Sequence, residues 1–291
     1  GYHRGAIRRV EGKGSVGMVN RVRYEKRTWP EIQEFVRRDA VVVIPTAAVE
    51  EHGHHLPLDT DVLIASHIAT QAALRASHPC LVMPTIWIGF EGHHMDFPGT
   101  IDVDWDLFIR YGLTVTRSLA HHGFRRMIVL NGHGSNRALI EIIARQTVIE
   151  RPDTLCAAIS WWELSDAQRV FNELRASEVT SHACELETSA YLAIEPESVQ
   201  MDKAVRDMHY DMSTHVWSDL MGRKPDPAFK SPVKMMEIWS TMSETGTRGD
   251  PTTATAEKGR RVLEAAIAEF AAIIDELGTR PIKEPRDHHA R

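Results

Sequence analysis

Cysteine is scarce in this chain, and the three cysteines lie far apart in the sequence: Cys80, Cys156 and Cys184. An odd number of widely spaced cysteines argues against a disulfide framework and favours a reducing compartment. The first residues also lack the apolar stretch of a signal peptide. We therefore expect a cytoplasmic protein.

Excess positive charge and long apolar runs are also missing. The formal net charge is -6, so the chain lacks the basic footprint that binds nucleic acid or an anionic membrane surface. No apolar run approaches the roughly 20 residues that span a bilayer. We therefore expect neither nucleic acid nor a membrane as a partner, which leaves a small-molecule substrate.

The composition is otherwise that of an ordinary folded domain. Hydrophobic residues make up 43% and charged residues 25% of the 291 residues, so a sizeable core can form. The length suits one large α/β domain, which we predict over residues 28–278. Residues 1–27 are basic and aperiodic, and we predict an arm that is mobile or packs on a partner subunit. Residues 279–291 are predicted to form a charged tail.

Short apolar runs alternate with amphipathic helical patterns along the domain. Strands are predicted over residues 40–45, 81–86, 127–130 and 155–160. The first of them is a continuous β-branched run, which is typical of a strand buried on both faces. Strands that alternate with helices predict a parallel sheet covered on both faces, with ligands at the carboxyl ends of the strands.

Candidate metal ligands follow several of these strands directly. Glu50 and His52 lie two residues apart in the loop after the first strand, so both can face one pocket, and Asp61 begins the next helix close enough to join them. His133 lies between two glycines in the turn after the third strand, where the backbone can turn sharply. His182 and Glu185 begin a later helix three residues apart and would share one face.

Together these segments offer two imidazoles and three carboxylates for a pair of divalent ions, zinc or manganese: Glu50, His52, Asp61, His133 and Glu185. A lone histidine after a strand is more often a cap, and a lone glutamate is more often exposed. The coincidence of all of them at one end of the sheet favours the metal site. We assign His182 to proton transfer, because an unperturbed imidazole has a pKa of about 6.5.

The segments resemble the creatininase (creatinine amidohydrolase) family over roughly residues 35–275. The matching blocks are residues 50–61, His94 with residues 97–100, residues 131–136, residues 182–189 and residues 249–251. The resemblance implies a three-layer αβα sandwich with a mainly parallel central sheet, a two-metal centre and hydrolysis of a cyclic or linear amide. It also implies a homo-oligomer, often a hexamer.

By position in the family, Glu50 and His133 would hold one ion, His52 would hold the other, and Asp61 would bridge them. Creatininase has a metal-binding glutamate two residues after the histidine that corresponds to His133, where this chain has Ser135. We therefore expect Glu185 to complete the second ion. Glu51 and His54 are expected to take no part.

The substrate side of the site is expected to differ from creatininase itself. Glu178 replaces the tryptophan that creatininase carries four residues before its catalytic histidine, so creatinine is not the favoured substrate. We expect Trp161 or Trp162 to form a substrate wall, and His94 and His55 to reach the substrate. The thiol of Cys184 could line the pocket, although we favour a packing role for it.

The favoured activity is therefore opening of a small cyclic amide at its C–N bond. The alternative is ring opening of a lactone or of a cyclic ketone such as an inosose, since the same site can attack any activated carbonyl. A catalytically silent metal-binding paralogue is less favoured, because the ligands and His182 are retained. A nucleotide-binding domain is disfavoured, because no glycine-rich phosphate loop follows a strand.

Overall fold

A four-stranded parallel sheet forms the centre of the computed structural model, which describes residues 19–209 and 211–289. Its strands lie in the order β2-β1-β3-β4, and each neighbouring pair is parallel. Their bounds are Val41–Thr46 for β1, Cys80–Val82 for β2, Arg126–Asn131 for β3 and Leu155–Ser160 for β4. The predicted parallel sheet is therefore confirmed.

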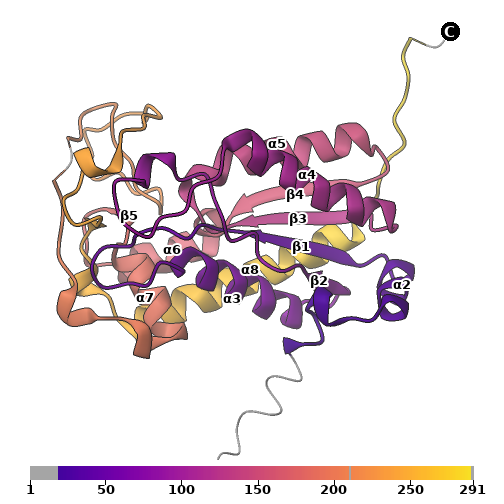
Figure 1. The fold of residues 1–291 in the computed structure, drawn as a ribbon, viewed down its shortest axis with the longest axis horizontal. Coiled ribbons are helices and arrows are strands. Elements are labelled where there is room, and N and C mark those ends of the chain that lie inside the picture. Colours follow the sequence, from indigo (N-terminus) through magenta and orange to yellow (C-terminus); the bar gives the residue numbers. More distant parts are fainter. Residues whose placement is uncertain (1–18, 210, 290–291) are drawn as a thin grey trace, which may run out of the picture.

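Helices cover both faces of this sheet and make three layers (Figure 1). The helices α4 and α5 lie on one face, and α3 and α8 lie on the other. Their bounds are Trp105–His121 for α4, Arg137–Glu150 for α5, Thr60–Arg75 for α3 and Ala256–Thr279 for α8. Among the described residues, three shorter α-helices complete the domain: α2 at Trp29–Arg37, α6 at Ser165–Leu174 and α7 at Glu185–Ile194.

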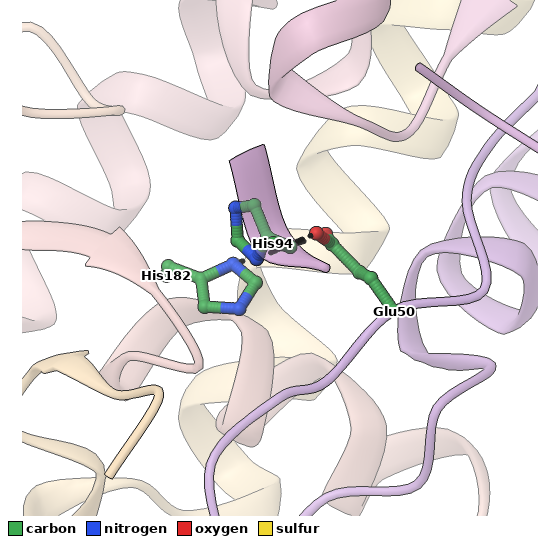
Figure 2. A group of neighbouring side chains, drawn as sticks. All are labelled: Glu50, His94 and His182. Atoms are coloured by element: carbon green, nitrogen blue, oxygen red, sulfur yellow. Dashed lines mark ion pairs between the residues drawn. The ribbon is translucent and has the colours of Figure 1, made fainter. Parts of the chain in front are cut away.

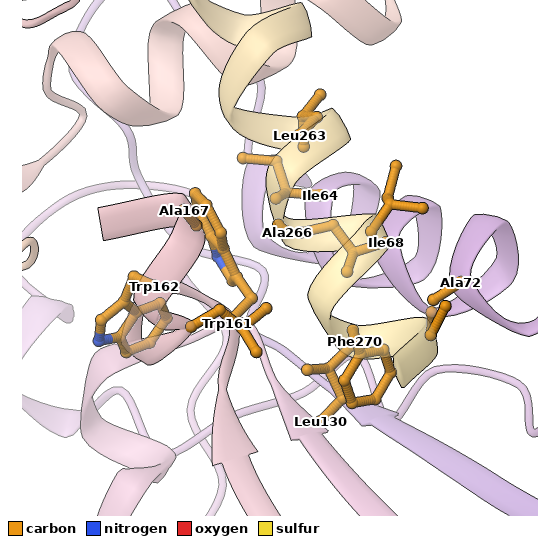
Figure 3. Packing of buried hydrophobic residues seen from close by; sticks show 14 of the residues in the cluster. Ile64, Ile68, Ala72, Leu130, Trp161, Trp162, Ala167, Leu263, Ala266 and Phe270 are labelled. Carbon is orange, nitrogen blue, oxygen red and sulfur yellow. The ribbon is translucent and has the colours of Figure 1, made fainter. Parts of the chain in front are cut away.

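The β-branched run of β1 explains why both faces are covered. Successive side chains of a strand point to opposite faces, so Val41 and Val43 pack into the core on the α3 and α8 side. Val42 and Ile44 pack into a second core on the other side. Figure 3 shows the first core, where the sheet meets α3 and α8 through these side chains: Leu130, Ile64, Ile68 and Phe270.

The strand β2 is shorter than the predicted strand over residues 81–86. The ladder ends at Val82, and Pro84 follows, which has no N–H to donate. Ile86 returns to the sheet in a single parallel bridge with Thr46.

The structure describes only part of the two segments that flank the predicted domain. Most of the predicted arm, residues 1–18, lies outside the described residues. Residues 19–27 lie against the domain, because the Val22 carbonyl accepts a hydrogen bond of 2.7 Å from the Val82 N–H, and Val22 is only 8% exposed. At the other end α8 continues to Thr279, and the residues described beyond it are mostly exposed.

A second, two-stranded antiparallel sheet lies beyond the carboxyl ends of the main strands (Figure 1). It pairs β5, Thr180–His182, with β6, Arg248–Gly249. The Gly-Asp-Pro block of the sequence therefore holds the segment that carries His182. In the part of the chain that the structure describes, no helix is long and apolar enough to cross a bilayer.

Candidate metal centre

The loop after β1 buries its acidic and histidine side chains. Glu50 is 1% exposed and His52 is 0% exposed. The Glu50 N–H donates to the Leu58 carbonyl at 3.1 Å, which closes the loop on itself. Gly53 has a φ of 64° and supplies the left-handed turn that this closure needs. The loop therefore directs both side chains into the protein.

Asp61 lies between two imidazoles in the first turn of α3. Its Oδ2 is 3.0 Å from Nδ1 of His133, and its Oδ1 is 3.3 Å from Nε2 of His52. Oε1 of Glu50 is also 3.0 Å from Nδ1 of His133 and lies 3.8 Å from Nε2 of His52. The structure thus brings together four of the five predicted ligands, and each Asp61 oxygen faces a different ring.

The side chain of Asn131 fixes the turn that follows β3 and carries His133. The Asn131 amide donates to the His133 carbonyl at 2.6 Å, and its oxygen accepts from the His133 N–H at 3.0 Å. A side chain at Gly132 would meet the Asp61 carbonyl oxygen at 2.9 Å. Glycine is therefore required where this turn packs against the start of α3.

The fifth predicted ligand, Glu185, does not join this group. Its carboxylate accepts from the backbone N–H groups of Ala176 and Ser177, the latter at 2.7 Å, and pairs with the Lys258 ammonium. Burial opposes ionisation of Glu185, but these donors, Lys258 first, lower the pKa of the carboxyl. The predicted ligand role of Glu185 is therefore corrected to that of a structural carboxylate.

Glu187 takes the position that was expected for Glu185. Two residues along a helix correspond to about 200° of rotation, so Glu187 points to the opposite side of α7. It is 7% exposed, and ligand atoms of Glu187, His52 and His182 all lie within 4.8 Å of one another. Burial raises the pKa of Glu187, while His52 and His182 act against that shift.

Cys184 packs at the start of α7, as favoured from the sequence. It is fully buried in the core on the α3 and α8 side. Its Sγ lies 3.8 Å from Oε2 of Glu187, and a side chain at Gly249 would meet its Cβ at 2.7 Å. Burial, with Glu187 nearby, raises the pKa of the thiol. Cys184 is thus a buried thiol that helps to seat α7.

His182 lies at the end of β5 with one ring nitrogen bound to the backbone. Its Nε2 is 2.7 Å from the Glu51 carbonyl oxygen, and its Nδ1 is 3.8 Å from Oε1 of Glu50. Ala183 follows with a φ of 49°, a costly left-handed conformation between β5 and α7. Burial disfavours the imidazolium, but Glu51 and Glu50 outweigh burial and raise the pKa of His182 well above its usual value.

Glu51, expected to take no part, contacts two histidines. Its Oε1 is 3.0 Å from Nδ1 of His94 and 3.2 Å from Nε2 of His182. Although burial opposes ionisation, His182 and His94 lower the pKa of Glu51 to about 2. The side chains of adjacent residues in an extended loop point in opposite directions. The sequence therefore predicted that only one of Glu50 and Glu51 faces the site. The turn at Gly53, whose N–H donates to Oε2 of Glu51 at 3.2 Å, lets both face inward.

His94 lies beside these residues and comes from the short helix η2, Gly92–His94. Figure 2 shows its ring beside Glu50 and His182, with its Nδ1 3.2 Å from Oε2 of Glu50. On its other side Trp239 stacks on it with ring centroids 4.5 Å apart. Trp239 also lies edge-on to His182 at 5.0 Å. Its segment, residues 205–245, has no periodicity that pointed to this position.

The predicted substrate wall, Trp161 and Trp162, lies in the hydrophobic core. The two indoles are 2% and 6% exposed and pack in the cluster that includes Ala167 and Phe270 (Figure 3). The wall role is therefore corrected to packing. Both residues follow β4 directly, where the turn into α6 carries them against α8 instead of the histidines.

His55 is fixed by α7. Its Nε2 is 2.9 Å from the Thr188 hydroxyl, and only 1% of the residue is exposed. Burial, with His52 as the next cause, lowers the pKa of His55 to about 4. A neutral imidazole bound to Thr188 orients α7, and no surface of it is presented to a substrate.

The residues present suit divalent cations. Two buried polar atoms of the site, Oε2 of Glu50 and Nε2 of His52, make no hydrogen bond among the described residues, although His94 and Asp61 lie at ion-pair distance from them. A buried carboxylate or imidazole without such a partner is costly, and a cation would satisfy these atoms. Carboxylates with imidazoles are ligands that zinc and manganese accept.

The chain belongs to the creatininase family, because the family described as Creatininase, creatinine amidohydrolase, matches residues 25–274. The chain is thus a creatininase-family hydrolase, and the predictions of the family and of a hydrolytic enzyme are confirmed.

Relatives of the chain have different named activities. A creatinine amidohydrolase of Pseudomonas putida is 29% identical over 266 residues, which are 86% of this chain and 94% of the relative. A 3-dehydro-scyllo-inosose hydrolase of Thermotoga maritima is 30% identical over 63% of this chain, and the match spans 60% of that relative's length. A mycofactocin precursor peptide peptidase of Mycolicibacterium smegmatis is 30% identical over 77% of this chain and 79% of the relative.

Solved creatininase structures have the same fold. A manganese form superposes with a TM-score of 0.74 at 26% identity, over 89% of this chain and 99% of that one. A mutant creatininase of Zn-Zn type is equally similar in fold, with a TM-score of 0.74. The predicted three-layer creatininase-like fold is therefore confirmed.

Proposed function

We propose that this chain is a binuclear metal-dependent hydrolase that opens a small cyclic amide at its C–N bond. The observation that carries the proposal is the Asp61 carboxylate, whose two oxygens face two different imidazoles, His52 and His133. A carboxylate so placed is suited to bridge two cations.

Two divalent ions, zinc or manganese, suit the donor set. Glu50, Asp61 and His133 would hold the first, and His52, Asp61 and Glu187 would hold the second. When bound, such ions polarise a carbonyl and supply a nucleophilic water at neutral pH. The remaining tasks, which are to position the substrate, exclude bulk water and move protons, belong to the protein.

His182 is assigned to proton transfer through its Nδ1. Its Nε2 lies 2.7 Å from the Glu51 carbonyl oxygen, so Nε2 carries the hydrogen and donates it there. The carboxylates of Glu51 and Glu50 raise the pKa of His182, and cations held by Glu50 would oppose this shift. The neutral imidazole that they favour has its lone pair on Nδ1, the nitrogen on the Glu50 side. Nδ1 can accept a proton during attack on the carbonyl and return it to the leaving amide nitrogen.

The proposed site of cleavage is an amide C–N bond. An amide nitrogen leaves only after protonation, and His182 supplies that proton, which supports an amide. Glu178, in place of a creatininase tryptophan, is exposed and offers no aromatic wall for creatinine itself. The second candidate is ring opening of a lactone or an inosose-type ketone, which the Thermotoga maritima relative supports. A peptide, named for the mycobacterial relative, is a third amide substrate to test.

Metal analysis combined with a substrate panel tests the proposal. Protein expressed with ample zinc or manganese is expected to hold about two ions per chain, and fewer than about 0.2 would overturn the metal centre. The panel comprises cyclic amides, linear amides including peptides, lactones and inososes. Turnover of cyclic amides is expected, whereas turnover of lactones or inososes alone would select the second candidate. No turnover by metal-loaded protein would favour a silent paralogue.

The variant His182→Ala separates chemistry from metal binding. We expect the metal content to stay intact while kcat falls about 100-fold or more, because the proton-transfer group is lost. Unchanged kcat would remove His182 from the mechanism, and loss of an ion would make it a ligand. Glu173→Ala, at an exposed position of α6, is the matched control.

A further inference from the structure

The buried carboxylate of Glu91 is used neither as a ligand nor as a proton carrier in the function proposed above. Glu91 is 0% exposed and lies in the loop between β2 and η2. It forms an ion pair with Nε2 of His133. The other nitrogen of that ring, Nδ1, faces Glu50 and Asp61, each at 3.0 Å. Glu91 thus contacts the ring nitrogen of His133 that does not face Glu50 and Asp61.

The backbone of Glu91 is fixed at both of its polar groups. Its N–H donates to Oδ1 of Asp102 at 2.6 Å, and its carbonyl accepts from the N–H of His94 at 2.8 Å. The preceding residue, Phe90, donates its N–H at 3.1 Å to Asn136, which lies in the turn that carries His133. The loop is therefore tied to the same turn as the imidazole that Glu91 contacts.

A neutral imidazole has one N–H and one lone pair, and only the lone pair binds a metal. A carboxylate that accepted a hydrogen bond from Nε2 would keep the hydrogen on that nitrogen and leave the lone pair on Nδ1. Histidines that ligate metals commonly donate their second N–H to a carboxylate in this way, and removal of that partner typically weakens metal binding about 10- to 100-fold.

We propose that Glu91 is a positioning residue that sets the tautomer and orientation of His133, so that Nδ1 is presented to a divalent ion between Glu50 and Asp61. The proposal rests on the metal-dependent function proposed above. It assigns Glu91 to the support of a ligand, whereas the ligands themselves are Glu50, Asp61 and His133.

A direct ligand role for Glu91 is the competing explanation. Ligand atoms of Glu50, Glu91 and His133 lie within 4.8 Å of one another. The two roles differ in what Co²⁺ reports when it replaces the native ion. Loss of a ligand changes the visible absorption spectrum at saturation, whereas loss of a positioning residue changes the Co²⁺ concentration needed to reach saturation.

The test uses the full chain with Co²⁺ and Zn²⁺ titrated into metal-free protein, in the wild type, Glu91→Leu and Glu91→Gln. We expect Glu91→Leu to weaken binding of one ion by about 10- to 100-fold with an unchanged Co²⁺ spectrum at saturation. Glu91→Gln, which keeps an acceptor oxygen, should restore part of the affinity. Glu178→Gln, at an exposed glutamate, should bind as the wild type does.

Unchanged affinity in Glu91→Leu, or an altered spectrum at saturation, would overturn the positioning role. If Glu91→Leu fails to fold, Asp102→Ala carries the test, because it frees the Glu91 backbone and should weaken the same ion in the same direction. Unchanged affinity in Asp102→Ala would then count against the proposal. A wild type that binds no metal would instead refute the proposed function, so the two failures are distinguishable.

Discussion

Glu185 and Glu187 lie two residues apart at the start of α7, yet their carboxylates have different partners. Glu185 binds backbone N–H groups and Lys258, while Glu187 faces His52 and His182. We therefore expect Glu187→Gln to reduce the metal content from about two ions to about one, with loss of activity. Elemental analysis and a Zn²⁺ titration measure this change.

The matched variant Glu185→Gln should have the opposite pattern. Its metal content should equal that of the wild type, and its free energy of unfolding should fall by about 2 kcal/mol, because charge-assisted hydrogen bonds are lost. Urea unfolding of the metal-free proteins measures the difference. If Glu185→Gln lost an ion and Glu187→Gln did not, the original assignment of Glu185 as a ligand would be restored.

The ionisation of Glu185 also predicts a pH dependence. Its pKa in the folded protein is lower than the ordinary value of 4.5, so its carboxylate stabilises the folded state fully above that value. This contribution is lost as the pH falls through the folded-state pKa. The stability gap between the wild type and Glu185→Gln should therefore be constant from pH 6 to 8 and shrink in acid. Urea unfolding as a function of pH measures it, and a gap that grew in acid would contradict the assignment.

At the scale of elements, the short helix η7, Trp239–Thr241, closes one side of the site. Trp239 is 6% exposed, stacks on His94 and donates its indole N–H to the Gly246 carbonyl at 2.9 Å. We expect Trp239→Ala to lower kcat/KM about 10-fold or more, because the two histidine rings it contacts lose their packing. Trp239→Phe should retain most of the activity.

Steady-state kinetics on the substrate found in the panel measures the Trp239 effect, and metal content should not change in either variant. Trp217 is the control, because it lies in the same segment and stacks on Phe229 instead of on a histidine of the site. Equal losses in Trp217→Ala and Trp239→Ala would indicate a general effect on the segment.

The strands of the main sheet and the helices that cover it could be predicted from the sequence, because their apolar residues follow regular patterns. Residues 41–45 of β1 and 127–130 of β3 are all apolar, because both faces of these strands are covered, and α3 and α8 repeat apolar residues at helical spacing. The segment after residue 205 has no such repeat, since its conformation depends on contacts such as Asp207 with Ser243. Its part in the site, through Trp239, was therefore not predictable.

At the scale of the whole molecule, we predict a homo-oligomer. A group of large apolar side chains on and beside α4 is 47% to 54% exposed: Trp87, Leu107 and Tyr111. They line one hollow together, and contiguous exposed apolar surface commonly marks an interface. We propose that a second copy of the chain covers it. Light scattering on the purified protein measures the mass against the 32.8 kDa of one chain.

Tyr111→Glu should shift this mass downward, because it introduces a charge into the apolar group. Ala272→Glu, at an exposed position of α8 on the other face of the sheet, is the matched control and should leave the mass unchanged. A wild type that runs as a monomer, or equal behaviour of the two variants, would overturn the interface.

The sequence by itself determined the sheet type, the family and the loop that carries Glu50, His52 and Asp61. These rest on local patterns, namely apolar periodicity and short motifs whose residues are neighbours in the chain. Only the tertiary structure decided which glutamate of α7 faces the site, and that Glu51, Glu91 and Trp239 contact the histidines. Those contacts depend on helix rotation, on the turn at Gly53 and on the packing of loops distant in the chain, and local sequence does not encode such distances.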